Sequence, residues 1–153
     1  MRTWIITFIL AALTGGAATA SDKSEKADVL APLHQFVNAL NKGDKKTAIA
    51  ACATPASIID EIPPHEWQGA TACADWVNDL EANMKKDGMT DLIQTLGRPR
   101  AVDITGDRAF AIVPVTNSFK ENGKRVTEPG VLTVAFQKSE TGWHMTGWAY
   151  TRH

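Results

Sequence analysis

Residues 108–138 read RAFAIVPVTNSFKENGKRVTEPGVLTVAFQK, and apolar residues alternate with polar ones on both sides of Asn122-Gly123. A period of two is typical of a strand with one buried face. Asn-Gly is the dipeptide that two-residue hairpin turns favour. We therefore predict two strands, Arg108–Phe119 and Arg125–Lys138, that form an antiparallel hairpin.

Further strands are predicted on either side of this hairpin. The segment Gly142–Arg152 follows it after a short turn at Ser139–Thr141. The segment Leu92–Thr105 precedes it and is interrupted by Gly97-Arg98-Pro99, which indicates a bulge or a strongly bent strand. Short turns between successive strands indicate an antiparallel meander.

The N-terminal half has the periodicity of helices instead. Apolar residues recur at helical spacing in Asp28–Lys42, which Gly43 ends. Asp44 is a candidate N-cap for a second helix at Lys45–Cys52. A third helix is predicted at Ala70–Lys86.

Two short segments lie between the helices. Ala56–Asp60 is rich in β-branched residues and is predicted to be a strand, whereas Pro63–Gly69 is expected to be an irregular connection. Helices followed by strands predict an α+β domain with three N-terminal helices packed on one antiparallel sheet.

Composition limits the classes of function. The chain has 153 residues and a formal net charge of −1, which fits a single domain and argues against a nucleic-acid partner. The four histidines show no metal-binding spacing, and no Gly-rich phosphate loop is present. We expect neither a metal nor another cofactor.

The first residues have the pattern of a signal peptide. A basic start at Arg2 precedes the apolar run Trp4–Leu13 and the small-residue motif Ala18-Thr19-Ala20. We predict a signal peptide at 1–20 and an exported domain at 21–153, periplasmic or secreted, ordered from about residue 27 after a frayed tail. An uncleaved anchor is the alternative, although this run is too short to span a bilayer, which takes about 20 residues.

Export affects the interpretation of the only two cysteines, Cys52 and Cys73. In an oxidising compartment such a pair favours a disulfide, whereas in the cytosol both would be small buried apolar residues.

The order of these elements resembles the nuclear transport factor 2-like superfamily, also called SnoaL-like. The resemblance is carried by FVNALNKGD (Phe36–Asp44), ASIIDE (Ala56–Glu61) and GWHMTGW (Gly142–Trp148). It implies a cone, in which a strongly curved sheet wraps around a long helix and encloses an apolar pocket. It also implies a homodimer formed through the outer face of the sheet. The superfamily spans many activities, so the fold leaves the function open.

Ketosteroid isomerase, a member of this superfamily, allows a comparison by position. The general-base aspartate of that enzyme falls at Asp60, and its pocket phenylalanine falls at Trp76. Its two oxyanion donors, a tyrosine and a protonated aspartic acid, fall at Phe36 and near Leu132, which cannot donate hydrogen bonds. Steroid isomerisation by that mechanism is therefore not expected.

Two titratable residues are candidates for catalysis. Asp60 would face an apolar cavity, where burial raises a carboxyl pKa and suits it to proton transfer. Alternatively, Asp60 caps a turn or pairs with Arg98 or Arg100. His65 is the second candidate because its ordinary pKa is near neutral, or else it lies in a surface loop that Trp67 anchors.

The resemblance also implies which residues line the pocket. Alternation places His144, Thr146, Trp148 and Tyr150 on one face of the last strand, and the comparison with the isomerase turns that face toward the cavity. The expected pocket residues, each also explicable as core, are Phe36, Trp76, Phe110, Leu132, Trp148 and Tyr150.

Three functions fit this sequence. The first is an exported module that binds a small hydrophobic molecule in the pocket. The second is an isomerase, dehydratase or hydrolase of a small hydrophobic substrate, with Asp60 as general base. The third is an accessory protein that binds a partner through its sheet.

Overall fold

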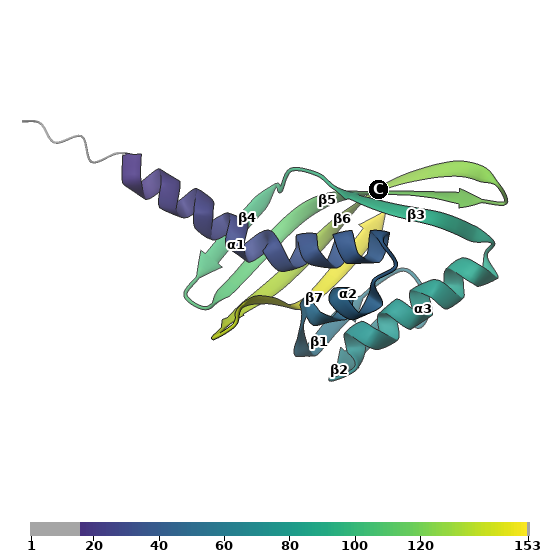
Figure 1. The fold of residues 1–153 in the computed structure, drawn as a ribbon, viewed down its shortest axis with the longest axis horizontal. Helices are drawn as coiled ribbons and strands as arrows, with labels where there is room; N and C mark the ends of the chain where they lie inside the picture. Colours follow the sequence, from purple (N-terminus) through teal and green to yellow (C-terminus); the bar gives the residue numbers. More distant parts are fainter. Residues whose placement is uncertain (1–15, 153) are drawn as a thin grey trace, which may run out of the picture.

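The computed structural model describes residues 16–152, with the backbone alone for 16–20. Two helices, α1 (Gly16–Asn41) and α2 (Lys45–Ala50), precede the first strand, and a third, α3 (Ala72–Lys86), lies between the second and third strands (Figure 1). The strands are β1 (Cys52–Ile59), β2 (Glu66–Gly69), β3 (Met89–Leu96), β4 (Ala101–Thr105), β5 (Arg108–Glu121), β6 (Lys124–Ser139) and β7 (Gly142–Arg152).

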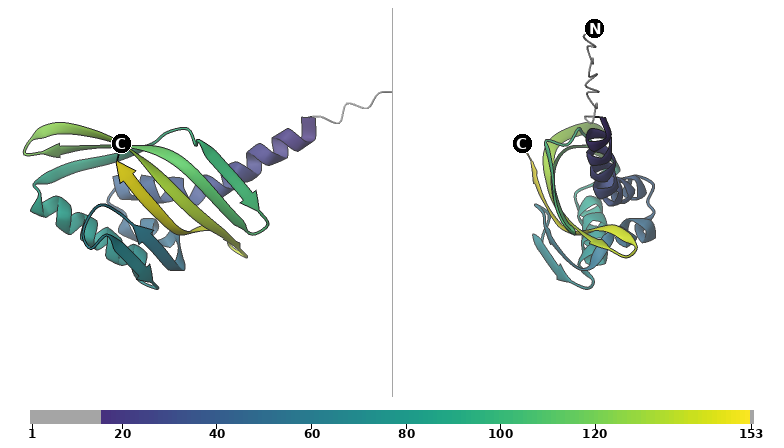
Figure 2. Two further views of the ribbon diagram at one scale, coloured as in Figure 1. Left: turned by 180° about the vertical axis from the view of Figure 1, so that it is seen from behind. Right: turned by 90° about the vertical axis from the view of Figure 1, so that its left-hand side faces the viewer.

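All strands in this range belong to one curled, open sheet. Its order is β2-β1-β7-β6-β5-β3, with β4 pairing to β5 beyond the bend that follows β3. The sheet curves around the helices, which lie on its concave side (Figure 2). The α+β prediction is therefore confirmed. The bulge or bend predicted at Gly97-Arg98-Pro99 is instead a complete break, which separates β3 from β4, and both of these strands pair with β5.

The sheet is mixed, and not purely antiparallel as predicted. Strand β1 runs parallel to β7, whereas all other pairings among the described strands are antiparallel. Residues 60–141 separate these two strands, and a crossover of this length permits parallel pairing.

The hairpin turn is the one predicted. Asn122 and Gly123 both have positive φ angles, 49° and 80°, as a two-residue type I′ turn requires. Glu121 pairs with Lys124 next to this turn, and the ladder continues without a register shift to Arg108 and Gln137.

The first helix begins earlier than predicted. Ser21–Lys26, expected as a frayed tail, is helical, and Lys26 forms an ion pair with Asp22 one turn before it at 2.9 Å. The predicted cleavage site after Ala20 lies inside α1, whereas residues 1–15 of the predicted signal peptide lie outside the described residues.

Two boundaries near the site also differ from the prediction. The second helix ends at Ala50, and β1 begins at Cys52. Strand β2 forms within the predicted irregular connection and pairs with the end of β1. Only one of its residues, Trp67, is buried, so this short strand has no periodicity that a sequence pattern can reveal.

The core fills the space between the helices and the concave face. Val29, Leu33 and Val37 of α1 are almost fully buried, as are Val113 of β5 and Val134 of β6. The predicted disulfide between Cys52 and Cys73 is present and joins the start of β1 to the first turn of α3.

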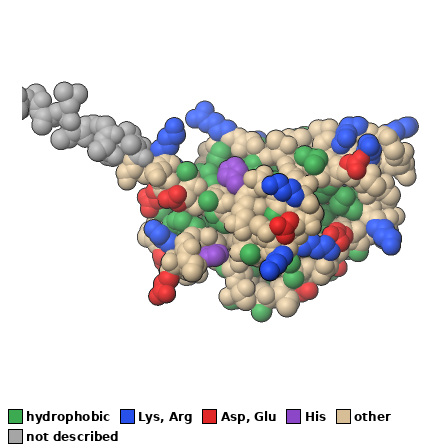
Figure 3. All heavy atoms as spheres, viewed as in Figure 1, with side chains coloured by type: hydrophobic (Ala, Val, Ile, Leu, Met, Phe, Trp, Pro, Cys, Tyr) green, Lys and Arg blue, Asp and Glu red, His purple; other side chains and the backbone are tan. Residues whose placement is uncertain are grey.

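The surface carries charges of both signs. Lysine and arginine side chains are interspersed with aspartate and glutamate on the face shown in Figure 3. Within residues 16–152, none of the helices has both the length and the apolar character that a membrane crossing needs.

Candidate functional site

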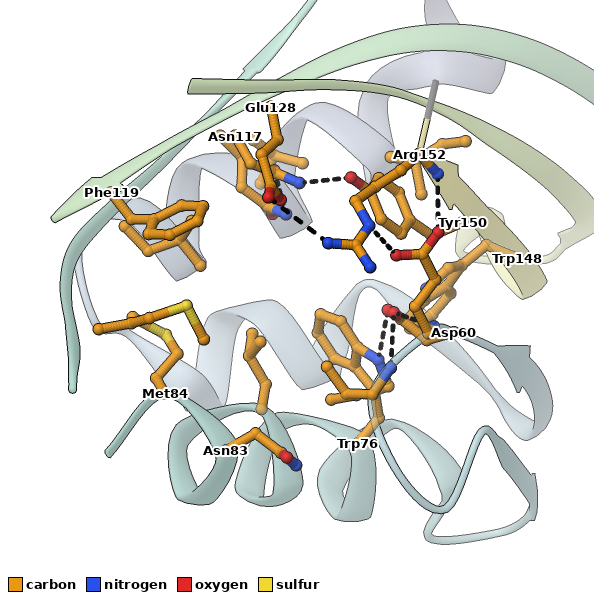
Figure 4. A pocket seen from close by; sticks show the side chains of 18 of the residues that line it. Asp60, Trp76, Asn83, Met84, Asn117, Phe119, Glu128, Trp148, Tyr150 and Arg152 are labelled. Atoms are coloured by element: carbon orange, nitrogen blue, oxygen red, sulfur yellow. Dashed lines mark hydrogen bonds and ion pairs between the residues drawn. The ribbon is translucent and has the colours of Figure 1, made fainter. Parts of the chain in front are cut away.

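A cavity of about 340 Å³ opens between α1, α3 and the concave face of the sheet (Figure 4). Its buried lining residues are all apolar, and its polar lining residues are all less buried. The apolar group includes Leu33, Phe36, Val37, Trp76, Leu132, Met145 and Trp148. The polar group includes Asp60, Glu61, Gln94, Asn117, Glu128, Tyr150 and Arg152.

Three aromatic rings form the centre of the apolar lining. Phe36 of α1 lies 4.9 Å from Trp148 of β7 and 5.7 Å from Trp76 of α3, measured between ring centroids. The two tryptophans meet edge to face at 5.3 Å. Such tilted and edge-on contacts stabilise aromatic pairs, so each ring fixes the other two.

Asp60 follows directly after β1 and reaches this aromatic cluster. Its Oδ1 accepts hydrogen bonds from the backbone N–H groups of Glu61, at 2.6 Å, and Ile62, at 3.4 Å. Its Oδ2 accepts one from the Trp76 indole Nε1 at 3.0 Å. The carboxylate therefore caps a turn and lines the cavity at once.

Burial raises the pKa of Asp60 above its ordinary value, and the negative charge of Glu61 adds to this effect. The hydrogen bonds from Trp76, Glu61 and Ile62 act in the opposite direction, but burial is the largest influence. The alternative of a pair with Arg98 or Arg100 is not seen, since the ion pairs found within residues 21–152 leave Asp60 out. A carboxylate with a raised pKa beside a cavity can accept a proton.

His65 lies near Asp60 in the chain but outside the cavity lining. Its side chain is exposed, and its Nδ1 lies 3.3 Å from the backbone oxygen of Asp60. The neighbouring Trp67 is buried and donates a hydrogen bond to Asp79 at 2.8 Å. The structure thus places His65 in a surface loop that Trp67 anchors.

A bulge in β7 decides which of its residues face the cavity. Met145 pairs with Phe136 and Gly147 pairs with Ala135, so Thr146 is an extra residue on β7. Beyond the bulge, Trp148, Tyr150 and Arg152 line the cavity, but before it the lining residue is Met145. The prediction that His144 and Thr146 share the cavity face is therefore wrong. His144 instead contacts the Thr141 hydroxyl at 3.0 Å.

Phe110 is the predicted pocket residue that the structure places elsewhere. Its side chain is 38% exposed, and it is absent from the cavity lining. On the first half of β5 the buried positions are Ala109, Ala111, Val113 and Val115, so the alternation turns Phe110 to the outer face. The other five, Phe36, Trp76, Leu132, Trp148 and Tyr150, line one cavity.

A chain of amide side chains reaches the cavity from the end of α1. The Asn41 side chain exchanges two hydrogen bonds with the Gln94 backbone, and Gln94 Nε2 donates to Asn117 Oδ1 at 3.1 Å. Asn117 Nδ2 in turn donates to the Tyr150 hydroxyl at 3.0 Å. Sequence reasoning missed this network because its members come from α1, β3, β5 and β7, and no local pattern connects them.

Arg152 forms ion pairs at the same edge of the cavity. Its guanidinium lies against Glu61 and also lies 3.5 Å from Glu128, and its backbone N–H donates to Glu61 at 3.0 Å. This arrangement joins the ends of β1 and β7 to β6. Within the described part of the chain, no group of three or more His, Cys, Asp or Glu side chains is arranged to hold a metal ion.

No family model and no curated protein sequence matches this chain. An NTF2-like protein with a cystatin-like fold from Novosphingobium aromaticivorans is similar in structure, with a TM-score of 0.70 and 16% identity over 91% of this chain and 88% of that one. This chain has the nuclear transport factor 2-like cone fold.

Two further structures share the cone fold at low identity. A ketosteroid isomerase-like protein from Erwinia carotovora atroseptica has a TM-score of 0.65 and 17% identity, covering 84% of this chain and 95% of its own. Hexachlorocyclohexane dehydrochlorinase LinA-type3 from Novosphingobium barchaimii has a TM-score of 0.68 and 13% identity, covering 88% of each chain. At such identities the likeness concerns the cone fold alone.

Proposed function

We propose that this chain binds one small, mainly hydrophobic molecule in its cone cavity. The observation that carries the proposal is the cluster of Phe36, Trp76 and Trp148, which is buried and yet lines a cavity of about 340 Å³. Small-molecule pockets commonly enclose about 300–1,000 Å³ and combine an apolar wall with few polar groups. The volume of this cavity lies in that range, and its buried wall is apolar.

The neutral fluorescent dye N-phenyl-1-naphthylamine tests the proposal. We expect saturable binding that Leu132→Glu weakens at least about tenfold, because a charged side chain in the cavity disfavours an apolar guest. Thr95→Glu is the matched control, since Thr95 of β3 is exposed and absent from the cavity lining. Equal loss in both variants, or no saturable binding to the wild type, would reject the proposal.

A second candidate function is proton transfer by Asp60. It is favoured by the raised pKa of Asp60 and by its place in the cavity lining. In this reaction the carboxylate takes a proton from a carbon atom next to an electron-withdrawing group of the bound molecule. The carboxyl group then exchanges its proton with water and returns a proton to that molecule, or a leaving group departs with the electron pair and the proton passes from Asp60 to water.

Hydrogen exchange separates this candidate from simple binding. The probe is 2-acetylnaphthalene in deuterium oxide, whose methyl protons exchange when a base removes them. We expect the wild type to accelerate exchange and Asp60→Asn to abolish the acceleration while still binding the probe. Acceleration that survives in Asp60→Asn would exclude Asp60 as the base.

We also propose that the chain is exported and matures at Ser21. The apolar run Trp4–Leu13, the motif Ala18-Thr19-Ala20 and the disulfide Cys52–Cys73 support this proposal. The intact mass of the protein recovered from the bacterial periplasm tests it. We expect a chain that begins at Ser21, and a mass that retains Met1 would contradict it.

A homodimer through the outer sheet face is proposed as the oligomeric state. A row of small and apolar residues crosses that face, because Ile59 pairs with Ala149, Ala149 with Thr133, and Thr133 with Ile112. Ile59 is 55% exposed in the single chain. We expect native mass spectrometry to show a dimer that Ile59→Glu converts to monomer; a wild-type monomer would favour the alternative of an accessory protein with a different partner.

A further inference from the structure

We propose that Tyr150 is held as a hydrogen-bond donor to the bound molecule, which therefore carries a neutral acceptor oxygen, such as a ketone or an ether, on an otherwise hydrophobic frame. This inference rests on the proposed binding function and adds the chemical class of the ligand. Four features of the structure lead to it: the amide chain behind Tyr150, its unused proton, the space beside its ring and the charges around it.

The hydrogen-bonded chain of amide side chains determines which group of Asn117 faces Tyr150. Asn117 Oδ1 accepts from Gln94, so the Nδ2 group of Asn117 is the part that faces Tyr150. Gln94 and Asn117 are direct partners in the β3–β5 ladder, and Asn41 of α1 binds the Gln94 backbone on both its N–H and its C=O. The donor that reaches Tyr150 is thus anchored by three elements of the fold.

The phenol accepts this bond and keeps its own proton free. Among residues 21–152 the Tyr150 hydroxyl donates no hydrogen bond to an acceptor, and Tyr150 lines the cavity. Burial raises the pKa of Tyr150, and the negative charges of Glu61, Glu128 and Asp60 raise it further. The hydroxyl therefore stays protonated at neutral pH, and its proton is available to a guest in the cavity.

The backbone leaves room for the ring in this position. A Cβ atom built on Gly130 of β6 would lie 2.5 Å from Cε2 and 2.8 Å from the hydroxyl oxygen of Tyr150, and 2.9 Å from the Thr151 backbone oxygen. Only glycine can occupy this position while the phenol keeps its place, because the nearby backbone oxygen leaves little freedom to shift.

The charges around the hydroxyl select a neutral acceptor. Asp60, Glu61 and Glu128 lie in the same lining, and the positive charge of Arg152 is already paired with the two glutamates. A carboxylate or phosphate on the guest would be repelled by these groups. An uncharged carbonyl or ether oxygen avoids this repulsion and still accepts a proton from the phenol.

A pair of isosteric probes tests the inference: 2-acetylnaphthalene, which has a carbonyl oxygen, and 2-isopropenylnaphthalene, which has a methylene group in its place. Equilibrium dialysis gives both dissociation constants for each variant. In Tyr150→Phe we expect the affinity for the ketone, relative to that for the alkene, to fall by about two- to tenfold. The loss of one hydrogen bond of about 0.5–1.5 kcal/mol predicts a change of this size.

Three further variants make the result specific. Asn117→Leu keeps the phenol but removes the side chain that positions it, so it should change the ratio in the same direction by a smaller factor. This variant provides the test if Tyr150→Phe does not fold. Gly130→Ala should also lower the preference for the ketone, because it displaces the ring. Thr116→Val is the control on β5, next to Asn117 and outside the cavity lining, and should leave the ratio unchanged.

The outcomes distinguish this inference from the function on which it rests. If both probes bind and their ratio is the same in wild type and Tyr150→Phe, the role of Tyr150 is wrong while the binding function stands. If neither probe binds to the wild type, the binding function and this inference both fail. A shift of the ratio in Tyr150→Phe and Asn117→Leu, but not in Thr116→Val, supports the proposal.

Discussion

Asp60 shows how two opposed effects act on one carboxyl group. Burial disfavours its charge, whereas Trp76 and two backbone N–H groups stabilise it, and burial is the larger effect. Because its pKa is raised on folding, Asp60 contributes stability below its unfolded pKa of about 3.9 and loses that contribution as the pH rises through the folded pKa.

The first prediction follows from this sign. Asp60→Asn does not titrate, so wild type should lose stability relative to this variant between about pH 4 and pH 7. Urea unfolding of both proteins at the two pH values measures the difference. An increase in the relative stability of the wild type over this range would show that the folded pKa is lowered.

Trp76 is predicted to tune Asp60 directly. Its indole N–H bonds the ionised carboxylate, so Trp76→Phe should raise the pKa of Asp60 further. The pKa is read from the carboxyl ¹³C resonance of Asp60 in an NMR titration. Trp67→Phe is the matched control, because it removes an indole hydrogen bond to Asp79 and leaves Asp60 untouched. An unchanged Asp60 pKa in Trp76→Phe would argue against this bond.

At the scale of elements, the contact between β1 and β7 has no room for a side chain at Gly147. A Cβ atom there would lie 2.2 Å from the backbone oxygen of Ser57. Gly147→Ala should destabilise the fold by about 3 kcal/mol or more, since neither backbone can yield easily. The control is Gly97→Ala, whose Cβ would meet Pro114 at 3.2 Å and should cost far less. Chemical denaturation compares the two, and similar losses would count against the close approach.

The disulfide links the two elements that carry the candidate base and its partner. Cys52 begins β1, which leads to Asp60, and Cys73 lies one helical turn before Trp76 on α3. Its replacement by two alanines should lower the unfolding free energy by about 3 kcal/mol, the value expected for a loop of this length. Urea unfolding without reductant measures this, and a loss below about 0.5 kcal/mol would mean that the bridge does not constrain the unfolded chain.

Sequence patterns predicted the elements with strong periodicity and turn chemistry. Asn122-Gly123 marked the hairpin because both residues accept a positive φ angle, and Gly97-Arg98-Pro99 marked the break between β3 and β4. The patterns failed where tertiary contacts decide: β2 forms only because the edge of β1 is available, and the bulge at Thr146 reverses the alternation of β7.

At the scale of the whole molecule, the cone brings together residues that are far apart in the chain. Five of the six predicted pocket residues line one cavity. They could be predicted because the order of the helices and strands indicates the fold, and the fold places these five residues around the cavity. The amide chain to Tyr150 and the ion pairs of Arg152 were not predictable, since they depend on side chains that meet only when α1, β3, β5, β6 and β7 are assembled.

Methionine provides the most direct test of binding in this cavity. Met84, Met89 and Met145 all line it, and the only other methionine of the chain is Met1. Methyl-¹³C labelling therefore gives resonances that report on the cavity wall. On addition of N-phenyl-1-naphthylamine we predict shifts of these three resonances and NOEs from the dye to the Met145 methyl group. If the protein is saturated with dye and the Met145 methyl resonance neither shifts nor shows NOEs to the dye, the proposed site is contradicted.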